Sequence, residues 1–299
     1  MDIILDISNE YFLDRVWANV LPRHVSPYSN SSSIPLAVDP VSAWPRDHIG
    51  RQLISLVVLT LIGIHCLYFI FAGLSYQFIF NHDMMRHPRF LKNQVKLEIQ
   101  TSLRSFPWMM LLTLPWFQAE VMGYSKLYNS IDDYGAAYFW LSIPCFLLFT
   151  DYSVYWVHRI LHHPMLYKTF HKPHHKWIIP TPFASYAFHP VDGYLQSVPY
   201  HLFVFMFPLH RKLYLALFVF VNFWSILIHD SDMITGHFLE KVINGPAHHT
   251  LHHLYFTVNY GQYFTWADRV GGSYRQPESQ LDPLLEVADS HETEVKKMQ

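Results

Sequence analysis

Residues 53–80 read LISLVVLTLIGIHCLYFIFAGLSYQFIF and contain no Asp, Glu, Lys or Arg. About 20 consecutive apolar residues are enough for an α-helix to cross the hydrocarbon core of a bilayer. The composition of the whole chain agrees, because 51% of its residues are hydrophobic and only 15% are charged, whereas an average soluble protein has about 25% charged residues. The sequence therefore predicts an all-α integral membrane protein.

Three further apolar segments follow this one. Residues 106–121 and 136–157 each predict a membrane helix, although two prolines and a glutamate interrupt the first of them. Residues 195–228 are apolar again, with a basic turn at 210–212, so they form either two short spans or a re-entrant hairpin. We therefore expect about four transmembrane helices, of which the last two form this short hairpin.

The charges of the loops predict the orientation of the chain in the membrane. Residues 81–104 carry five basic and two acidic side chains, so the positive-inside rule places this loop in the cytosol and the N-terminus in the lumen. We expect a loosely structured lumenal arm at 1–50, a membrane-embedded domain at 51–275, and a flexible cytosolic tail at 276–299.

Short signals near the two ends agree with the endoplasmic reticulum membrane. Asn30 begins a glycosylation sequon, which matters only if the N-terminal arm is lumenal. The chain ends in Lys296-Lys297-Met298-Gln299, which resembles the dilysine signal that retrieves membrane proteins to the endoplasmic reticulum. The net charge of −2, without a patch dense in Lys or Arg, argues against binding of nucleic acid.

Ten of the 21 histidines fall in three short clusters. The clusters read HRILHH from His158, HKPHH from His171 and HHTLHH from His248. Spacings of three and four residues place side chains on one face of a helix, and neutral imidazole is a ready ligand for Fe, Zn, Cu or Ni. Because buried ring nitrogens need partners, the clusters predict a metal centre.

The type of metal follows from the donor set. A structural zinc site needs four ligands and usually includes cysteines, whereas eight or more histidines indicate two metal ions. The chain has no HExxH motif, and its two cysteines lie in apolar stretches. Redox-inert zinc cannot oxidise an unactivated C–H bond, so two irons beside a membrane suggest oxygen activation on a lipid.

The arrangement HxxxHH, HxxHH and HHxxHH resembles the fatty acid hydroxylase and sterol desaturase superfamily of membrane di-iron enzymes. Within it, HKPHHKWIIPTPFASYAFHPVDGYLQSVPYH at 171–201 and GPAHHTLHHLYFTVNYGQYFTWADRVGGSYR at 245–275 are similar to the sterol C5-desaturase family, whose members are Δ7-sterol 5(6)-desaturases or lathosterol oxidases. The resemblance covers roughly residues 45–275. The histidine pattern indicates the superfamily, and the two long stretches indicate the sterol branch.

The resemblance implies a fold, a reaction and a set of metal ligands. The fold would be a membrane bundle carrying a cytosolic histidine-rich di-metal domain. The reaction would be O2-dependent desaturation of a Δ7-sterol at C5–C6 to a 5,7-diene in sterol biosynthesis, with two iron ions and electrons from NADH through cytochrome b5 and its reductase. The implied metal ligands are His158, His162, His171, His174, His175, His249, His252 and His253. The adjacent His163 and His248 are either further ligands or partners that support the ligands, and His229 could complete the set from just outside the third cluster.

Other residues have two interpretations each. Asp151 lies seven residues before His158 on the same helical face, so its carboxylate either orients an imidazole or solvates the membrane interface, and Asp230 has the same alternatives. His189 beside a proline is a weaker ligand candidate that could instead cap a turn. Aromatic residues could line a sterol pocket, namely Phe183, Tyr186, Tyr194, Tyr260, Tyr263 and Trp266.

Two other functions remain open from the residues alone. A related di-iron lipid hydroxylase, such as a C4-methylsterol oxidase or a fatty acyl hydroxylase, would use the same histidines. A histidine-rich membrane metal transporter is the non-enzymatic alternative. Transport favours polar residues distributed through the spans, whereas these spans are nearly free of charge.

Overall fold

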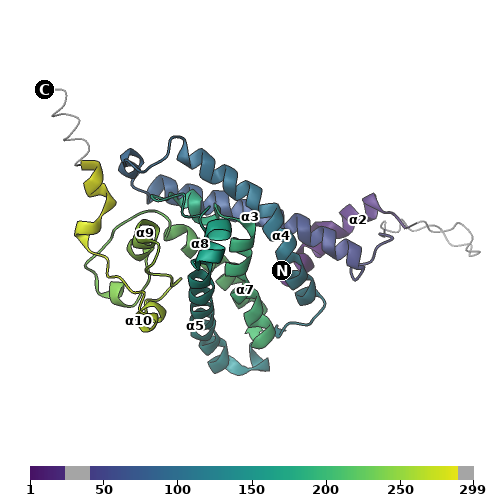
Figure 1. Ribbon diagram of the computed structural model, residues 1–299. Coiled ribbons are helices and arrows are strands. Elements are labelled where there is room, and N and C mark those ends of the chain that lie inside the picture. Colours follow the sequence, from purple (N-terminus) through teal and green to yellow (C-terminus); the bar gives the residue numbers. More distant parts are fainter. Residues whose placement is uncertain (24–40, 289–299) are drawn as a thin grey trace, which may run out of the picture.

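The computed structural model describes residues 1–23 and 41–288 of the chain, and the Asn30 sequon and Lys296-Lys297 lie outside these ranges. The described part is mostly helical, as predicted (Figure 1). Its α-helices are α1 (Asp2–Ser8), α2 (Asp14–Val20), α3 (Ile49–Phe78), α4 (Gln94–Val121), α5 (Gly135–Leu161), α6 (Pro164–Leu166), α7 (Pro190–Met206), α8 (Arg211–Leu227), α9 (Pro246–Tyr255) and α10 (Trp266–Gly271). Two short strands, β1 (Leu127–Tyr128) and β2 (Leu209–His210), form one parallel pair.

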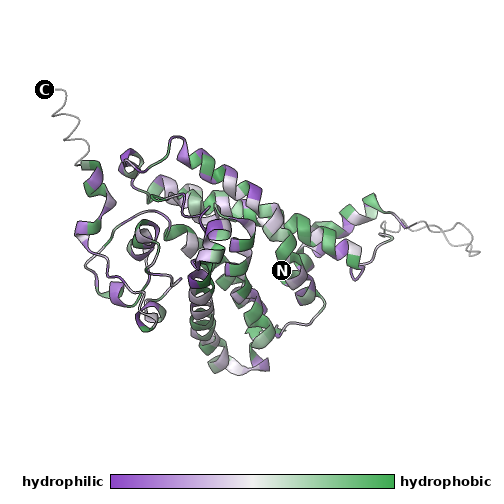
Figure 2. Ribbon diagram, viewed as in Figure 1, coloured by the Kyte–Doolittle hydropathy of each residue, from purple (hydrophilic) through white to green (hydrophobic). Residues whose placement is uncertain are grey.

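Two of the described helices, α3 with 30 residues and α5 with 27, are long and apolar enough to cross a membrane. Figure 2 shows hydrophobic residues along the long helices. Large apolar side chains remain exposed on both of them, at Ile54, Val58 and Ile62 in α3 and at Leu148, Tyr152 and Trp156 in α5. Their four-residue spacing gives each helix an apolar outer stripe, which fits contact with lipid better than contact with water.

Helix α4 contains the predicted span at 106–121 but begins earlier, at Gln94. Its polar first turns are stabilised by tertiary contacts, since Gln94 donates to the Ile179 carbonyl at 2.7 Å and the buried Glu98 carboxylate accepts from Thr181. These contacts tie the start of α4 to the segment that follows the second histidine cluster. An apolar pattern could not reveal this part of the helix, because the residues buried there are polar.

The predicted apolar segment 195–228 falls in two short helices joined by a turn, α7 and α8, of 17 residues each. Each helix is about 25 Å long, which is shorter than the roughly 30 Å of a bilayer core. The pairing of β1 with β2 holds the turn of this hairpin beside the loop that follows α4. One charge of the basic turn is paired, because Arg211 lies 2.8 Å from Asp2 and 2.6 Å from Asp6.

The expectation of a loosely structured arm is wrong for the first 20 residues. They form α1, a five-residue π-helix and α2. Leu5, Leu13 and Trp17 pack in one apolar cluster with Leu56 of α3 and Phe117 of α4. The helices are therefore stabilised by contacts with distant elements, which the local sequence does not show.

The described part of the predicted flexible tail is also ordered. Residues 283–288 are helical, and Leu284 packs against the cluster of Phe80, Met84 and Ile179. The Glu286 carboxylate accepts from Arg89 at 2.7 Å. These contacts fasten the segment to the loop between α3 and α4.

Candidate metal centre

The three histidine clusters meet at one end of the helical bundle. The first lies at the end of α5, the second in the segment that follows it, and the third on α9. His229 follows directly after α8. Because α5 spans about 40 Å from the loop that carries β1 to the first cluster, the histidines lie far from the β1–β2 pair.

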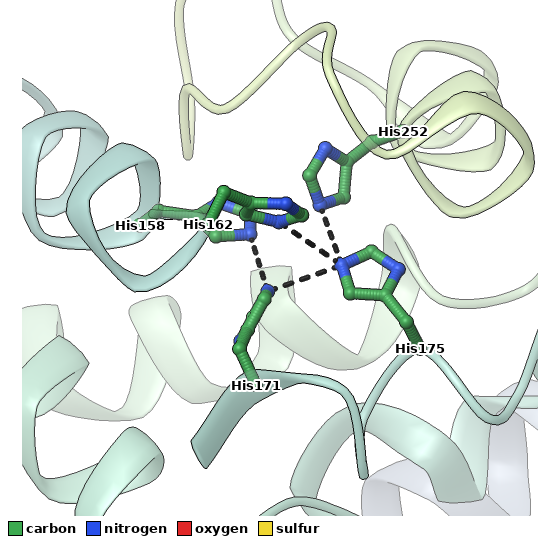
Figure 3. A group of neighbouring side chains, drawn as sticks. All are labelled: His158, His162, His171, His175 and His252. Carbon is green, nitrogen blue, oxygen red and sulfur yellow. Dashed lines mark hydrogen bonds between the residues drawn. The ribbon is translucent and has the colours of Figure 1, made fainter. Parts of the chain in front are cut away.

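Nine of the eleven predicted ligands form two groups, and within each group one ring nitrogen per residue lies within 4.8 Å of the others. The first group, shown in Figure 3, consists of His158, His162, His171, His175 and His252. The second group consists of His174, His229, His249 and His253. Each of the three clusters therefore contributes to a shared site, and the second and third clusters contribute to both groups.

The ring nitrogens of each group converge. In the first group, Nε2 of His175 lies 3.1 Å from the Nε2 atoms of His162, His171 and His252 (Figure 3). In the second group, Nε2 of His249 lies 3.0 Å from Nε2 of His229 and 3.1 Å from Nε2 of His253. The edges of the imidazoles thus face one another across two small volumes.

Hydrogen bonds at the nitrogen that points away from the centre of each group fix which ring nitrogen carries the proton. In five rings Nδ1 faces an oxygen and therefore donates, which leaves the lone pair on the converging Nε2. These bonds run from His158 to Tyr260 O at 3.0 Å, from His171 to Asp192 Oδ2 at 2.7 Å, from His229 to Ser225 O at 2.6 Å, from His252 to Val258 O at 2.7 Å and from His253 to Trp177 O at 2.9 Å.

Burial keeps these imidazoles neutral. The pKa of His175 and that of His252 lie well below the usual range of a histidine. The larger cause is the loss of solvent on burial, and the smaller is repulsion by neighbouring imidazoles. The same two causes lower the pKa of His249. Neutral rings with converging lone pairs fit two borderline transition-metal ions such as iron.

The carboxylate of Asp192 supports this site and was missed by the sequence analysis. It is fully buried at the start of α7, where it accepts from Nδ1 of His171 and from Nε2 of Gln196 at 2.8 Å. Asp192 lies 21 residues after His171, beyond an irregular segment. No helical or strand period joins the two residues, so no local pattern could have found the contact.

Asp192→Asn is expected to lower metal affinity, and any activity that depends on the metal, by about 10- to 100-fold, the range typical of partners that orient a metal-ligating histidine. The amide is neutral and can present its NH2 group to His171, so the proton on Nδ1 is less firmly fixed. The measurement is product formed per minute across a titration of ferrous iron. Full activity without added iron would show that this carboxylate does not orient the ring.

Among the described residues, neither Asp151 nor Asp230 forms a hydrogen bond or an ion pair with an imidazole. Asp151 Oδ1 instead accepts from the backbone N–H groups of Gln262, Tyr263 and Phe264. Asp230 Oδ1 accepts from the N–H of Asp232. The interpretation that either carboxylate orients a ring directly is therefore wrong. Asp151 acts on the turn that presents the Tyr260 carbonyl to His158.

Two predicted ligands lie outside both groups. His163 Nδ1 accepts from the Met165 N–H at the start of α6, and the His248 ring lies 5.8 Å from the ring of Tyr274. His189 accepts from the Val191 N–H at the start of α7, which fits the interpretation that it caps a turn. None of the three belongs to a converging set of ring nitrogens.

A mostly apolar cavity of about 470 Å³ reaches both groups. Its volume lies in the range of roughly 300–1,000 Å³ that is typical of small-molecule sites. His158 borders it from the first group, and His174, His229 and His249 border it from the second. The remaining lining comes mainly from α3, α4, α7 and α8. Of the aromatic residues considered from the sequence, Tyr186 is in this lining.

The fold and the site define a class of protein, namely a helical protein with two helices apolar enough to cross a membrane, in which two groups of imidazoles that could hold metal ions border an apolar cavity. Residues 143–273 match the fatty acid hydroxylase family. The chain is 50% identical to a Δ7-sterol 5(6)-desaturase of Aspergillus fumigatus, over 95% of this chain and 92% of that protein. It is 50% identical to a Δ7-sterol 5(6)-desaturase of Gibberella zeae, over 96% of this chain and 93% of that protein. It is 48% identical to lathosterol oxidase of Homo sapiens, over 93% of this chain and 87% of that protein.

The chain therefore belongs to the Δ7-sterol 5(6)-desaturase family, as the resemblance of its histidine-rich stretches predicted. No solved structure matches it.

Proposed function

We propose that this chain catalyses the O2-dependent desaturation of a Δ7-sterol at C5–C6, giving a 5,7-diene. The observation that carries the proposal is the apolar cavity that borders both imidazole groups, in a chain about half identical to sterol desaturases along nearly its whole length. One turnover removes a hydrogen from each of two neighbouring sterol carbons. With one O2, two electrons and two protons, it releases two waters.

The nine imidazoles of the two groups would hold two iron ions, and His163 and His248 would not be ligands. Bound iron would supply the oxidation of a C–H bond by O2, which no amino-acid side chain provides. The chain itself has three tasks. It keeps the ring nitrogens unprotonated by burial, fixes the rings through the bonds at Nδ1, and holds the sterol in a cavity from which bulk water is excluded.

The proposal includes a location in the endoplasmic reticulum membrane, with about four crossings, the histidines in the cytosol and the N-terminus in the lumen. Helices α3, α4 and α5 would cross the membrane, and the hairpin of α7 and α8 would enter it and return to the same side. Exposed lysines beside the second cluster, Lys168, Lys172 and Lys176, fit a cytosolic side. Electrons would come from NADH through cytochrome b5 and its reductase. The membrane-embedded domain would be residues 51–275, and the tail after it would carry the dilysine signal.

The test is sterol analysis by gas chromatography and mass spectrometry of C5-desaturase-deficient cells that express the chain. The expected product is a 5,7-diene with its ultraviolet absorption. Accumulation of a hydroxylated lipid with unchanged Δ7-sterols would instead support a hydroxylase. Unchanged lipids at full expression, with altered cellular metal content, would support a transporter.

A further inference from the structure

The lining of the cavity changes in polarity along helix α8. His229, in the second imidazole group, follows the end of the helix, and Ser225 and Asn222 line the cavity before it. Further from the metal groups, α8 contributes apolar side chains to the lining, including Phe218 and Leu215. Asn222 lies two helical turns, or about 10 Å along the axis, from His229. The cavity is therefore polar near the metal groups on this wall and apolar beyond.

Tyr186 faces Asn222 across this polar part of the cavity. It ends the 3-10 helix η5 (Pro182–Tyr186), and its hydroxyl donates to Oδ1 of Asn222. Asn222 is itself fixed, because its Nδ2 donates to the Phe218 carbonyl at 2.5 Å. The Tyr186 ring lies 6.1 Å from the ring of Phe188, which lies 5.7 Å from the His174 ring.

The hydroxyl of Tyr186 is suited to a second, neutral hydrogen bond. Burial raises the pKa of Tyr186, so the phenol stays protonated. Its proton is given to Asn222, and the phenolic oxygen keeps lone pairs that can accept from a ligand. Because Tyr186 and Asn222 both line the cavity, a ligand hydroxyl placed there would meet a fixed acceptor.

The structure of a sterol determines where such an acceptor is needed. The 3-hydroxyl is on ring A, C5–C6 belong to the adjoining ring B, and the alkyl tail extends from the opposite end of the ring system. When C5–C6 faces the metal groups, the hydroxyl must lie in the nearby part of the cavity and the tail in the distant part. The distant part is lined mainly by apolar side chains, among them Ile4, Leu59 and Phe117, with His201 beside Phe117.

We propose that Tyr186, oriented by Asn222, binds the 3-hydroxyl of the sterol and so fixes which end of the molecule lies beside the metal groups. This inference rests on the proposed sterol desaturation. Tyr186 is thereby a residue for substrate binding and positioning.

The test compares two substrates, a Δ7-sterol and its 3-deoxy analogue, in membranes that contain the wild type or Tyr186→Phe. We expect wild-type kcat/KM to be about ten-fold higher for the hydroxylated substrate, as the loss of one neutral hydrogen bond implies. Tyr186→Phe should lower that ratio to about one, because the hydroxylated substrate loses the hydrogen bond that the deoxy analogue never makes. Asn222→Leu, which frees the hydroxyl of Tyr186, should lower the ratio in part.

The matched control is Tyr68→Phe. Tyr68 packs 5.8 Å from Tyr186 and donates to the Phe183 carbonyl, but it is not among the residues that line the cavity. Its loss should affect both substrates equally and leave the ratio unchanged. An unchanged ratio in Tyr186→Phe would overturn the assignment of the hydroxyl site, whereas absence of any 5,7-diene with the wild type would overturn the proposed function itself.

Discussion

His252→Ala is expected to lower 5,7-diene formation by more than about 100-fold and to remove one of the two proposed iron ions. His252 Nε2 lies 3.1 Å from Nε2 of His175 in the first group, and the second group does not include it. A direct ligand should matter more than the partners that orient ligands, which typically account for 10- to 100-fold. The measurements are diene formed per minute and iron per chain in the purified protein.

The matched control for this variant is His163→Asn. His163 is adjacent to the first-group residue His162, yet it is exposed and caps α6 through Nδ1. Asparagine is a good capping residue, so both iron content and activity should stay within about two-fold of the wild type. Loss of iron in His163→Asn, or two irons and full activity in His252→Ala, would contradict the proposed division of ligands.

The sequence predicted most of the histidines whose ring nitrogens converge, because their spacing is local. His158 and His162 are four residues apart, so their side chains lie on one face of the helix, whereas His163, the next residue, lies on a different face. The same reasoning fails for His248, which is four residues before His252 but lies outside both groups. The ring of His248 faces Tyr274, a contact over 26 residues of chain that no helical period describes.

The supporting contacts were beyond prediction for the same reason. Asp192 reaches His171 across an irregular segment, and Asp151 reaches a turn more than 100 residues away. For the fold, the apolar runs located α3 and α5, since lipid-facing helices are apolar throughout. They did not locate the early start of α4 or the N-terminal helices, because those are stabilised by buried polar groups and by packing between distant elements.

Asp151→Leu is expected to lower the melting temperature by about 10 °C or more and to reduce iron content with it. The buried Oδ1 of Asp151 accepts from the N–H groups of Gln262 at 3.1 Å, Tyr263 at 2.7 Å and Phe264 at 3.2 Å. Leucine leaves three donors without an acceptor, and each costs about 1–3 kcal/mol. The summed cost of the three donors is a large part of a typical folding free energy of about 5–15 kcal/mol. In a domain of this size, a loss of about 1 kcal/mol lowers the midpoint of thermal unfolding by 2–4 °C.

Asp151→Asn tests whether an accepting oxygen is enough to stabilise the turn when the negative charge is removed. Its amide oxygen can replace Oδ1, and its NH2 group would take the place of Oδ2, which has no hydrogen-bond partner in the described part of the chain. We therefore expect a loss of only a few degrees, measured by thermal unfolding of the detergent-solubilised protein. Equal losses in the two variants would assign the effect to the charge of Asp151. A stable Leu variant with full iron content would show that the turn places the Tyr260 carbonyl behind His158 without this carboxylate.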